Sequence, residues 1–423
     1  MLSTLQSVWK IPDLRKKITF TLLMFLVFRL GAHVPVPGIN ADAIKDLLQT
    51  GTLFGFFDVI SGGAFKNFTV FAMGIMPYIN ASIIIQLLTV VIPYFEKLAK
   101  EGEEGRRKMN QYTRYGTVVL ALIQALGMSF FLTRSGNVLV SDSAFSIAVI
   151  VISLTAGTAF LMWLGELITE HGIGNGISLL IFAGIVSRLP AGLYSIGEYL
   201  RAGTTSIASV TLFAVIAVVV IAGIVAIQEG QRRIPVQYAK RVVGRRMYGG
   251  QSTHIPLKVN QAGVIPVIFA MSILLFPTTI SAWFPTNPIA QTINAIFDPR
   301  SIPYMVMYAL LIIFFTYFYT AVTFNPQDVA ENMKKYGGFI PGLRPGRPTA
   351  EYIDKILTRI TLAGAVFLAA IALLPNLVMG ITGLNIYFGG TALLIVVGVA
   401  LETMKQLESH LLMRNYQGFM KKL

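Results

Sequence analysis

Residues 71–93 combine the length of a membrane span with side chains that hydrocarbon tolerates poorly. The segment is long enough to cross a bilayer, which takes about 20 apolar residues. Helix-breaking and polar residues nevertheless lie inside it: Gly74, Pro77, Asn80, Ser82 and Gln86. Such groups are costly at membrane depth unless they face protein or a water-filled cavity. The pattern therefore predicts a kinked span with a polar side, which suits the wall of a pore.

Isoleucines at helical spacing stand beside these polar groups. Because residues four apart share one face of a helix, each of two segments presents a row of bulky aliphatic side chains. The rows are Ile75, Ile79 and Ile83 in the first segment, and Ile177, Ile181 and Ile185 in the second. These side chains are apolar, and a row of bulky aliphatic groups beside a polar face suits the wall of a pore. For each isoleucine taken alone, packing against lipid or against other helices is the favoured explanation.

The residues that enzymes use are present, but not in catalytic arrangements. The sequence contains neither a GxxxxGKS/T phosphate loop nor a GxSxG nucleophile motif. Its four histidines are scattered, and GIGNG at 172–176 lacks the spacing of a dinucleotide-binding loop. Because the chain has no cysteine, disulfides, thiolate metal sites and cysteine nucleophiles are excluded. We expect neither enzymatic activity nor a cofactor or metal.

Composition places the chain among proteins that cross a membrane many times. Of its 423 residues, 54% are hydrophobic and 13% are charged, which is about half the charge of a typical soluble protein. The fold class we expect is an all-α polytopic membrane protein with ten transmembrane helices. The ten apolar spans lie at about 18–34, 71–93, 116–133, 145–168, 177–193, 207–227, 262–283, 304–324, 360–379 and 386–404.

Basic residues are concentrated on one side of this topology. The net charge is +14, and 27 of the 34 lysines and arginines fall in the two terminal tails and in every second loop. By the positive-inside rule these segments, and with them both termini, are cytoplasmic. The even number of spans agrees with that orientation.

The external loop 194–206 divides the chain into two sets of five spans. An odd number of spans in each half turns the second half upside down relative to the first, as in inverted-repeat membrane proteins. That ten spans divide evenly by two is the plainer explanation. The expected organisation is a tail (1–17), an N-terminal half (18–193), a hinge loop (194–206), a C-terminal half (207–407) and a tail (408–423).

The first outer loop contains an apolar piece, 53–66, that is too short to span a bilayer. It could lie on the membrane surface as an interfacial helix, or fold back toward the membrane centre where protein or a cavity surrounds it. From the residues alone, the interfacial helix is the favoured prediction.

The large inner loops, 228–261 and 325–359, are too basic to be simple connectors. In the first loop IPVQYAKRVV and STHIPLKV alternate apolar with polar residues, which indicates two strands. GRRMYGG between them predicts a hairpin turn with Arg245 and Arg246 near its tip. Setting topology or touching anionic lipid is the plainer role for such charges. A projecting basic hairpin favours docking onto RNA or an acidic protein face.

Several motifs together resemble the SecY family, the channel subunits of the bacterial protein translocase. They occur in the same order along the whole chain: GIMPYINASIIIQLL, EGRRKMNQYTRYG, HGIGNGISLLIFAGIVSRLP, QYAKRVVGRRMYGGQSTHIPLKVNQAGVIPVIFA, GFIPGLRPGRPT and YFGGTALLIVVGVALETMKQ. The resemblance implies a clamshell of two inverted five-helix halves around an hourglass pore. It also implies that 53–66 is a short re-entrant plug helix rather than an interfacial helix.

The resemblance assigns roles to individual residues, grouped here by the part of the channel. The pore ring is Ile75, Ile79, Ile177, Ile181, Ile268 and Ile395. The plug contains Phe54, Phe57, Ile60 and Phe65. A lateral gate between the spans at 71–93 and 262–283 includes Ser82, Gln86, Gln124 and Pro266, with Pro77, Pro266 and Pro277 expected to kink those spans. The docking residues are Arg232, Arg233, Lys240, Arg245, Arg246 and Arg344.

The partners implied by the resemblance are those of a translocase. They are SecE-type and SecG-type small membrane subunits, the SecA motor ATPase, the ribosome and polypeptides bearing signal sequences, with anionic lipids at the membrane surface. The expected function is a channel in the bacterial plasma membrane that passes unfolded secretory polypeptides and releases apolar segments into lipid.

Two other classes of membrane protein account for part of the sequence. A secondary transporter would need ion-coupling groups near the midplane, whereas Arg29 is the clearly intramembrane charge and lies near the outer end of its span. A passive scaffold that docks ribosomes explains the basic loops, but it explains neither the two isoleucine rows nor the short segment 53–66.

Overall fold

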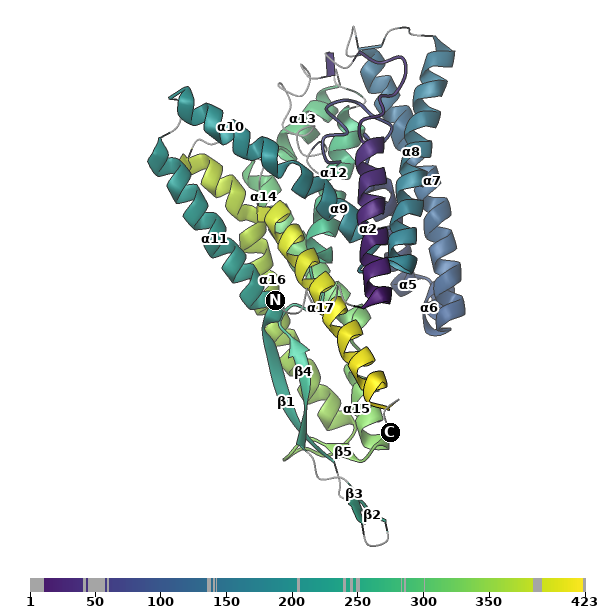
Figure 1. The fold of residues 1–423 in the computed structure, drawn as a ribbon, viewed down its shortest axis with the longest axis vertical. Helices are drawn as coiled ribbons and strands as arrows, with labels where there is room; N and C mark the ends of the chain where they lie inside the picture. The colour runs from purple at the N-terminus through teal and green to yellow at the C-terminus, as the bar shows by residue number, and fades with distance from the viewer. Residues whose placement is uncertain are drawn as a thin grey trace.

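The computed structural model describes most of the 423 residues. The described ranges are 11–40, 43–44, 58, 61–134, 138–139, 141, 143–203, 206–238, 241–243, 246–248, 252–282, 284, 287–299, 301–382 and 390–420. Within them the chain is mainly helical, with a small antiparallel sheet at one end (Figure 1).

The described helices are divided between the two halves of the chain. The N-terminal half contains α2 (Pro12–Gly31), α5 (Met76–Val91), α6 (Pro93–Lys100), α7 (Glu103–Arg134), α8 (Ala144–His171), α9 (Gly176–Ser187) and α10 (Leu189–Arg201). The C-terminal half contains α11 (Ile207–Glu229), α12 (Ile265–Ala282), α13 (Pro288–Ile296), α14 (Ile302–Thr323), α15 (Pro326–Lys335), α16 (Arg347–Thr382) and α17 (Gly390–Met420).

Each of the ten predicted spans overlaps at least one helix, and the fifth overlaps two. Within the described residues, six helices are long and apolar enough to cross a membrane, or seven if the bent pair α5 and α6 counts as one span. Many helices begin where the sequence supplies an N-cap. Ser143, Ser206 and Ser301, for example, each accept a hydrogen bond from the backbone amide three residues on, which satisfies a donor that the first helical turn leaves open.

Three details of the predicted spans are wrong. Residues 71–75 are in turns, so the helix at 71–93 begins at Met76; Pro77 starts it instead of kinking it, because proline is tolerated in the first turn. Pro266 likewise starts α12, and only Pro277 lies inside that helix. The sharp bend, of 100°, comes instead between α5 and α6, at Pro93.

The predicted hinge loop 194–206 is also largely helical. Helix α9 ends at Ser187, and α10 takes up the remainder of the fifth predicted span and continues to Arg201. Helices α10 and α13 lie at the end of the molecule opposite the sheet (Figure 1).

The packing of helices in the two halves follows one scheme. In the N-terminal half, α2 packs on α8 and α9, α5 on α7 and α8, and α8 on α7 and α9. Counting five spans further along the chain gives the corresponding C-terminal pairs: α11 packs on α16 and α17, α12 on α14 and α16, and α16 on α14 and α17. Between the halves, α5 packs on α12 and α9 packs on α17. In each of these pairs the two helices occupy equivalent positions in the two halves. This agreement supports an internal repeat over chance division, and five spans per half make it an inverted one.

The sheet at the far end confirms the predicted strands and adds a third. Strand β1 (Gln231–Tyr238) pairs antiparallel with β4 (Ser252–Lys258), and β5 (Gly338–Phe339) pairs with the end of β1. The predicted turn GRRMYGG is partly strand, because β2 (Arg241–Val243) pairs with β3 (Arg246–Tyr248). Arg246 therefore lies on a strand. This sheet and α15 lie toward one end of the molecule, which we call the hairpin end (Figure 1).

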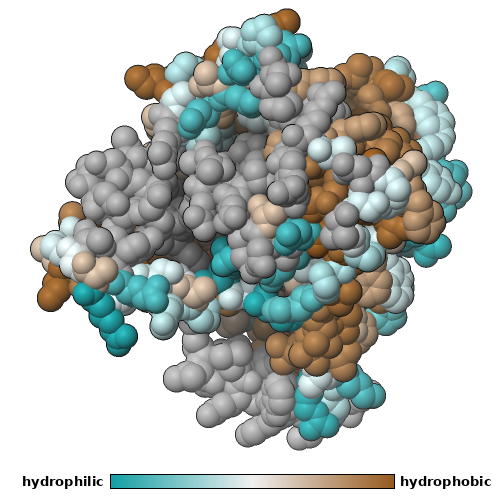
Figure 2. Space-filling view, turned by 90° about the horizontal axis from the view of Figure 1, so that it is seen from above, coloured by the Kyte–Doolittle hydropathy of each residue, from teal (hydrophilic) through white to brown (hydrophobic). Residues whose placement is uncertain are grey.

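Apolar side chains remain exposed along the outer flanks of the helices. Examples are Val118, Val119 and Leu122 on α7 and Val215, Val218 and Val219 on α11. Seen from the end opposite the hairpin end, apolar residues form part of the rim of the molecule, with polar residues among them (Figure 2). Such flanks are expected where helices face lipid.

We predict that Gly157→Ala destabilises the N-terminal half. A Cβ built at Gly157 in α8 would lie 1.9 Å from the carbonyl oxygen of Val70, so the backbone would have to shift, at a cost of about 1–3 kcal/mol. The apparent melting temperature of the purified protein in detergent should fall.

Gly116→Ala on α7 is the matched control. Its Cβ would lie 3.5 Å from that of Ala81, which is ordinary contact, and alanine is the better helix former by about 1 kcal/mol. Equal melting temperatures for the two variants would contradict a close backbone contact between Gly157 and Val70.

Candidate functional site

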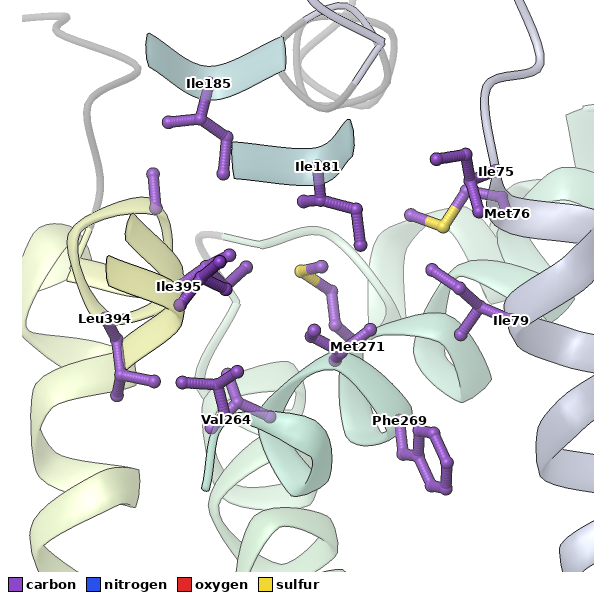
Figure 3. Close-up of a cluster of buried hydrophobic side chains, with 14 of the residues drawn as sticks. Ile75, Met76, Ile79, Ile181, Ile185, Val264, Phe269, Met271, Leu394 and Ile395 are labelled. Carbon is purple, nitrogen blue, oxygen red and sulfur yellow. The ribbon is translucent and has the colours of Figure 1, made fainter. Parts of the chain in front are cut away.

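One large apolar cluster joins the two halves of the molecule. Five of the six predicted ring residues belong to it and are nearly inaccessible, with exposures of 2–7%: Ile75, Ile79, Ile181, Ile268 and Ile395. They come from α9, α12 and α17 and from the start of α5. In Figure 3 the side chains of Ile79, Ile181 and Ile395 point toward a common centre from three different helices. The structure thus brings together residues that lie more than 300 positions apart in the chain.

The start of α5 is shaped so that it delivers two of these isoleucines. Gly74 has φ +58°, a left-handed conformation that favours glycine, and it lies directly before the N-cap residue Ile75. The amide of Ile79 then donates to the carbonyl of Ile75 (3.1 Å). Ile75 and Ile79 are therefore stacked on one face of the first helical turn, as their spacing predicts.

Helix α9 is held against α8 by a close contact between glycines. A Cβ at Gly176 would lie 1.9 Å from the carbonyl oxygen of Gly165. The side chain of Asn175 caps α9 by accepting from the amide of Ser178 (3.2 Å). The packing fixes the direction of α9, and with it the position of Ile181.

Ile177 is placed differently from the other predicted ring residues. It is half-buried, and a Cβ at Gly165 would lie 2.4 Å from its Cδ1, so its side chain packs against α8. It touches the edge of the cluster only. The sequence spacing could not predict this difference, because Ile177 and Ile181 lie on the same side of α9. They differ only in that Ile177 packs against α8.

Two methionines occupy the centre of the cluster and were not predicted. Met76 and Met271 are 4% and 3% exposed, and both point toward the isoleucines in Figure 3. Methionine is unbranched and flexible, so it fills irregular gaps and repacks easily. No spacing rule marks such residues in the sequence.

The chemistry of the cluster is that of a barrier. The side chains drawn in Figure 3 are aliphatic, aromatic or thioether groups. They offer no charge, so they exclude water and ions and give a passing chain no strong hydrogen bond.

The predicted gate residues lie on α5, α7 and α12. Ser272 on α12 approaches Met76 on α5, with 3.9 Å between Oγ and Sδ. Gln124 lines a small cavity between α5, α7 and α12, together with Asn80, Ser272 and Thr279. Gln86 donates to Ser82 (3.3 Å), but both are on α5, so this bond does not cross between the helices. Pro266 is in the first turn of α12.

The short outer segment is buried where the structure describes it. Phe54, Phe57 and Ile60 lie outside the described residues. Asp58, Ala64 and Phe65 are at most 4% exposed, which favours a segment folded into protein over an interfacial helix. Residues 61–66 form turns, and Phe65 packs in a separate cluster within the N-terminal half.

The basic residues of the hairpin end are exposed on a rigid base. Arg232 and Arg233 are exposed on β1, whose Ile234 and Val236 are buried in a cluster with residues of β4, α15 and α16. Lys240 and Arg245 lie outside the described residues, and the side chain of Arg246 is not described.

Arg344 is held out by its own loop. Gly342 and Gly346, on either side of it, have φ of +85° and +105°, which an L side chain rarely adopts. The hydroxyl of Thr349 donates to the Arg344 carbonyl (2.8 Å) and ties the loop to the start of α16. The exposed guanidinium is thereby presented on a fixed turn.

Comparison with known proteins agrees with this geometry. A family model described as SecY matches residues 69–404. The chain is similar to the protein translocase subunit SecY of Halalkalibacterium halodurans, with 51% identity over the whole of both chains. It is similar to that of Thermus thermophilus, with 48% identity over 99% of this chain and 98% of the relative.

Solved structures share the fold at low identity. One, described as the structure of a protein conducting channel, has a TM-score of 0.66 at 18% identity, covering 95% of this chain and 96% of its own. Another, Sec61 in the canine ribosome-channel complex from the endoplasmic reticulum, has a TM-score of 0.65 at 17% identity, with the same coverage of both chains.

We predict that Ile395→Asn makes the resting protein conduct ions. An amide at the common centre of the cluster would hydrate it and weaken its dewetting. The measurement is the ion current across planar bilayers containing the purified protein.

Leu394→Asn is the control, because Leu394 is equally buried on the same helix but points away from the centre in Figure 3. It should lower thermal stability without raising the current. Equal currents from both variants would argue against a barrier at Ile395.

Proposed function

The chain belongs to the SecY family, and we propose that it forms a protein-conducting channel in the bacterial plasma membrane. It would pass unfolded secretory polypeptides across the membrane and release apolar segments sideways into lipid. The observation that carries the proposal is the apolar cluster, to which α5 and α9 of one half and α12 and α17 of the other contribute. Family membership also sets aside the secondary transporter and the passive scaffold.

The cluster suits transport of chains that differ in sequence. A polar or charged constriction would bind some segments and reject others, whereas aliphatic side chains and methionines yield without holding a substrate. In this proposal Ile75, Ile79, Ile181, Ile268 and Ile395 form the pore ring, and Ile177 supports it from the side of α8.

The lateral opening would run between α5 and α12. These helices belong to different halves and meet through side chains such as Met76 and Ser272. Polar contacts between membrane helices are worth only about 0.6–2 kcal/mol each. An apolar signal sequence could therefore compete for the space between the two helices.

The hairpin end would face the cytoplasm. Both terminal tails and the basic loops belong to this side by the positive-inside rule, and the sheet carrying Arg232 and Arg233 projects from it (Figure 1). The proposed partners there are the ribosome and the SecA motor ATPase, with Arg344 as the contact for the motor. Anionic lipid would meet the basic residues nearest the membrane.

Small membrane subunits would complete the assembly. The relatives are named as subunits of a translocase. Two halves that can separate along α5 and α12 need a clamp on the outside, which is the role proposed for a SecE-type helix, with a SecG-type subunit beside it.

A cysteine crosslink tests whether polypeptides pass through the cluster. The chain has no cysteine of its own, so Ile79→Cys supplies a single thiol. A secretory polypeptide with one cysteine, stalled during transport, should form a disulfide with it. Val119→Cys on α7, 58% exposed on the outer flank, should not react. A stalled chain that crosslinks to Cys at neither 79, 181 nor 395 would overturn the proposal.

The basic residues on β1 should give ribosome binding much of its salt dependence. Removing one side chain that binds a phosphate reduces the slope of log affinity against log salt by about 0.7–0.9. We expect Arg232→Ala with Arg233→Ala to weaken ribosome binding at low salt and to reduce the slope. Binding is measured by cosedimentation with ribosomes over a salt series. Arg201, exposed on α10 at the opposite end, provides the control: Arg201→Ala should change neither the affinity nor the slope. An equal decrease in that variant would contradict binding through β1.

A further inference from the structure

Two arginines from distant parts of the N-terminal half converge on the outer segment ahead of α5, whose described residues here are 58 and 61–66. Arg29, near the end of α2, donates from Nη1 to the carbonyl of Gly62 (2.8 Å) and to the hydroxyl of Ser187 (3.4 Å). Arg188, between α9 and α10, forms an ion pair with Asp58. Both contacts link residues far apart in the sequence, so neither follows from local structure.

Asp58 is buried, and its two carboxylate oxygens have different partners. Its side chain is 4% exposed. Oδ1 accepts from the backbone amide of Lys66 (2.7 Å), which closes the turn of the segment, and Oδ2 receives the guanidinium of Arg188. Burial raises the pKa of the Asp58 carboxyl, while the charge of Arg188 opposes that rise. A carboxylate at this depth depends on its partner, because an unpaired buried charge is strongly unfavourable.

The backbone of the segment also lies directly against α9. Gly62 has φ +67°, and a Cβ there would lie 2.9 Å from Cα of Gly184. The hydroxyl of Ser187, one turn further along, donates to the Gly184 carbonyl (2.7 Å). Helix α9 thus carries Ile181 toward the apolar cluster and Gly184 and Ser187 toward the outer segment.

We propose that Arg29 and Arg188 are positioning residues that fix this outer segment to the N-terminal half and so set the closed state of the channel. We call the pair Asp58–Arg188, with the Arg29–Gly62 bond, the Asp58 latch. Its polar partners, Arg29, Ser187 and Arg188, all belong to the N-terminal half. The segment would therefore stay with that half when α5 and α12 separate, and its resting position would depend on one buried ion pair. The inference rests on the proposed channel function.

The test measures ion leak through the resting protein in sealed liposomes. Asp58→Asn and Arg188→Gln should each raise the leak, by about tenfold if either shifts the resting equilibrium by one decade. Because the two residues share one interaction, the double variant should leak no more than the worse single variant. The exchange of charges, Asp58→Arg with Arg188→Asp, should restore part of the seal. Arg29→Gln leaves Asp58 paired and should leak less than Arg188→Gln.

Arg201→Gln, at the other end of α10, is the matched control and should not leak. If Asp58 and Arg188 had a structural role alone, their variants would have a lower melting temperature and less transport as well as a higher leak. If they form a latch, the variants leak more while transport of a secretory polypeptide continues. Variants as tight as the wild type would overturn the latch. Additive leaks in the double variant would do the same. If single-cysteine proteins with the latch intact give no crosslink to a stalled chain at 79, 181 or 395, the channel function fails first, and the two failures are told apart.

Discussion

The closure of the molecule depends on apolar contact between two halves that are otherwise separately packed. Each half has its own scheme of helix contacts, and the two schemes are the same after a shift of five spans. The packing between the halves runs mainly through α5 on α12 and α9 on α17. All four helices contribute to one apolar cluster, so separating the halves and opening the cluster are the same event. A barrier at any other place would have to open within a half, against its own core.

Rigid halves make this arrangement workable. The glycines at 157, 165 and 176 bring backbone against backbone inside the N-terminal half, and native packing of this density resists deformation. By contrast, the centre of the cluster contains Met76 and Met271, the most adaptable of apolar side chains. Stiffness within the halves and softness between them confine motion to the interface.

The spans, the strands and the shared face of Ile75 and Ile79 could be predicted from the sequence because they depend on periodic patterns. Ile75 and Ile79 are on one face because a helix has 3.6 residues per turn, whatever surrounds it. Features decided by contacts between distant residues were missed. A proline inside an apolar span, such as Pro77, predicts a kink. Because the chain turns at Gly74, however, Pro77 lies in the first turn of a helix. Strand β5 exists only because β1 offers it an edge.

The charges show the same limit most clearly. In the sequence Arg29 is an isolated charge near the end of a span, for which reaching the membrane surface is a sufficient explanation. In the structure its guanidinium turns to Gly62 and Ser187, and Arg188 turns to Asp58. No spacing connects positions 29, 58 and 188, so only the fold reveals that they meet.

In the closed state that we propose, these contacts form two barriers of opposite chemistry in series. The apolar cluster closes by excluding water and can yield to any chain. The outer segment is held by a buried ion pair. Such a pair has a specific geometry, and removing one partner is strongly unfavourable because the other charge is left buried and unpaired. A barrier of the first kind alone would open with every fluctuation that admits water, and one of the second kind alone would bind charged substrates. Arg188 follows the end of α9, about two turns beyond Ile181, so the ion pair can fix the resting state without bringing a charge to the apolar cluster.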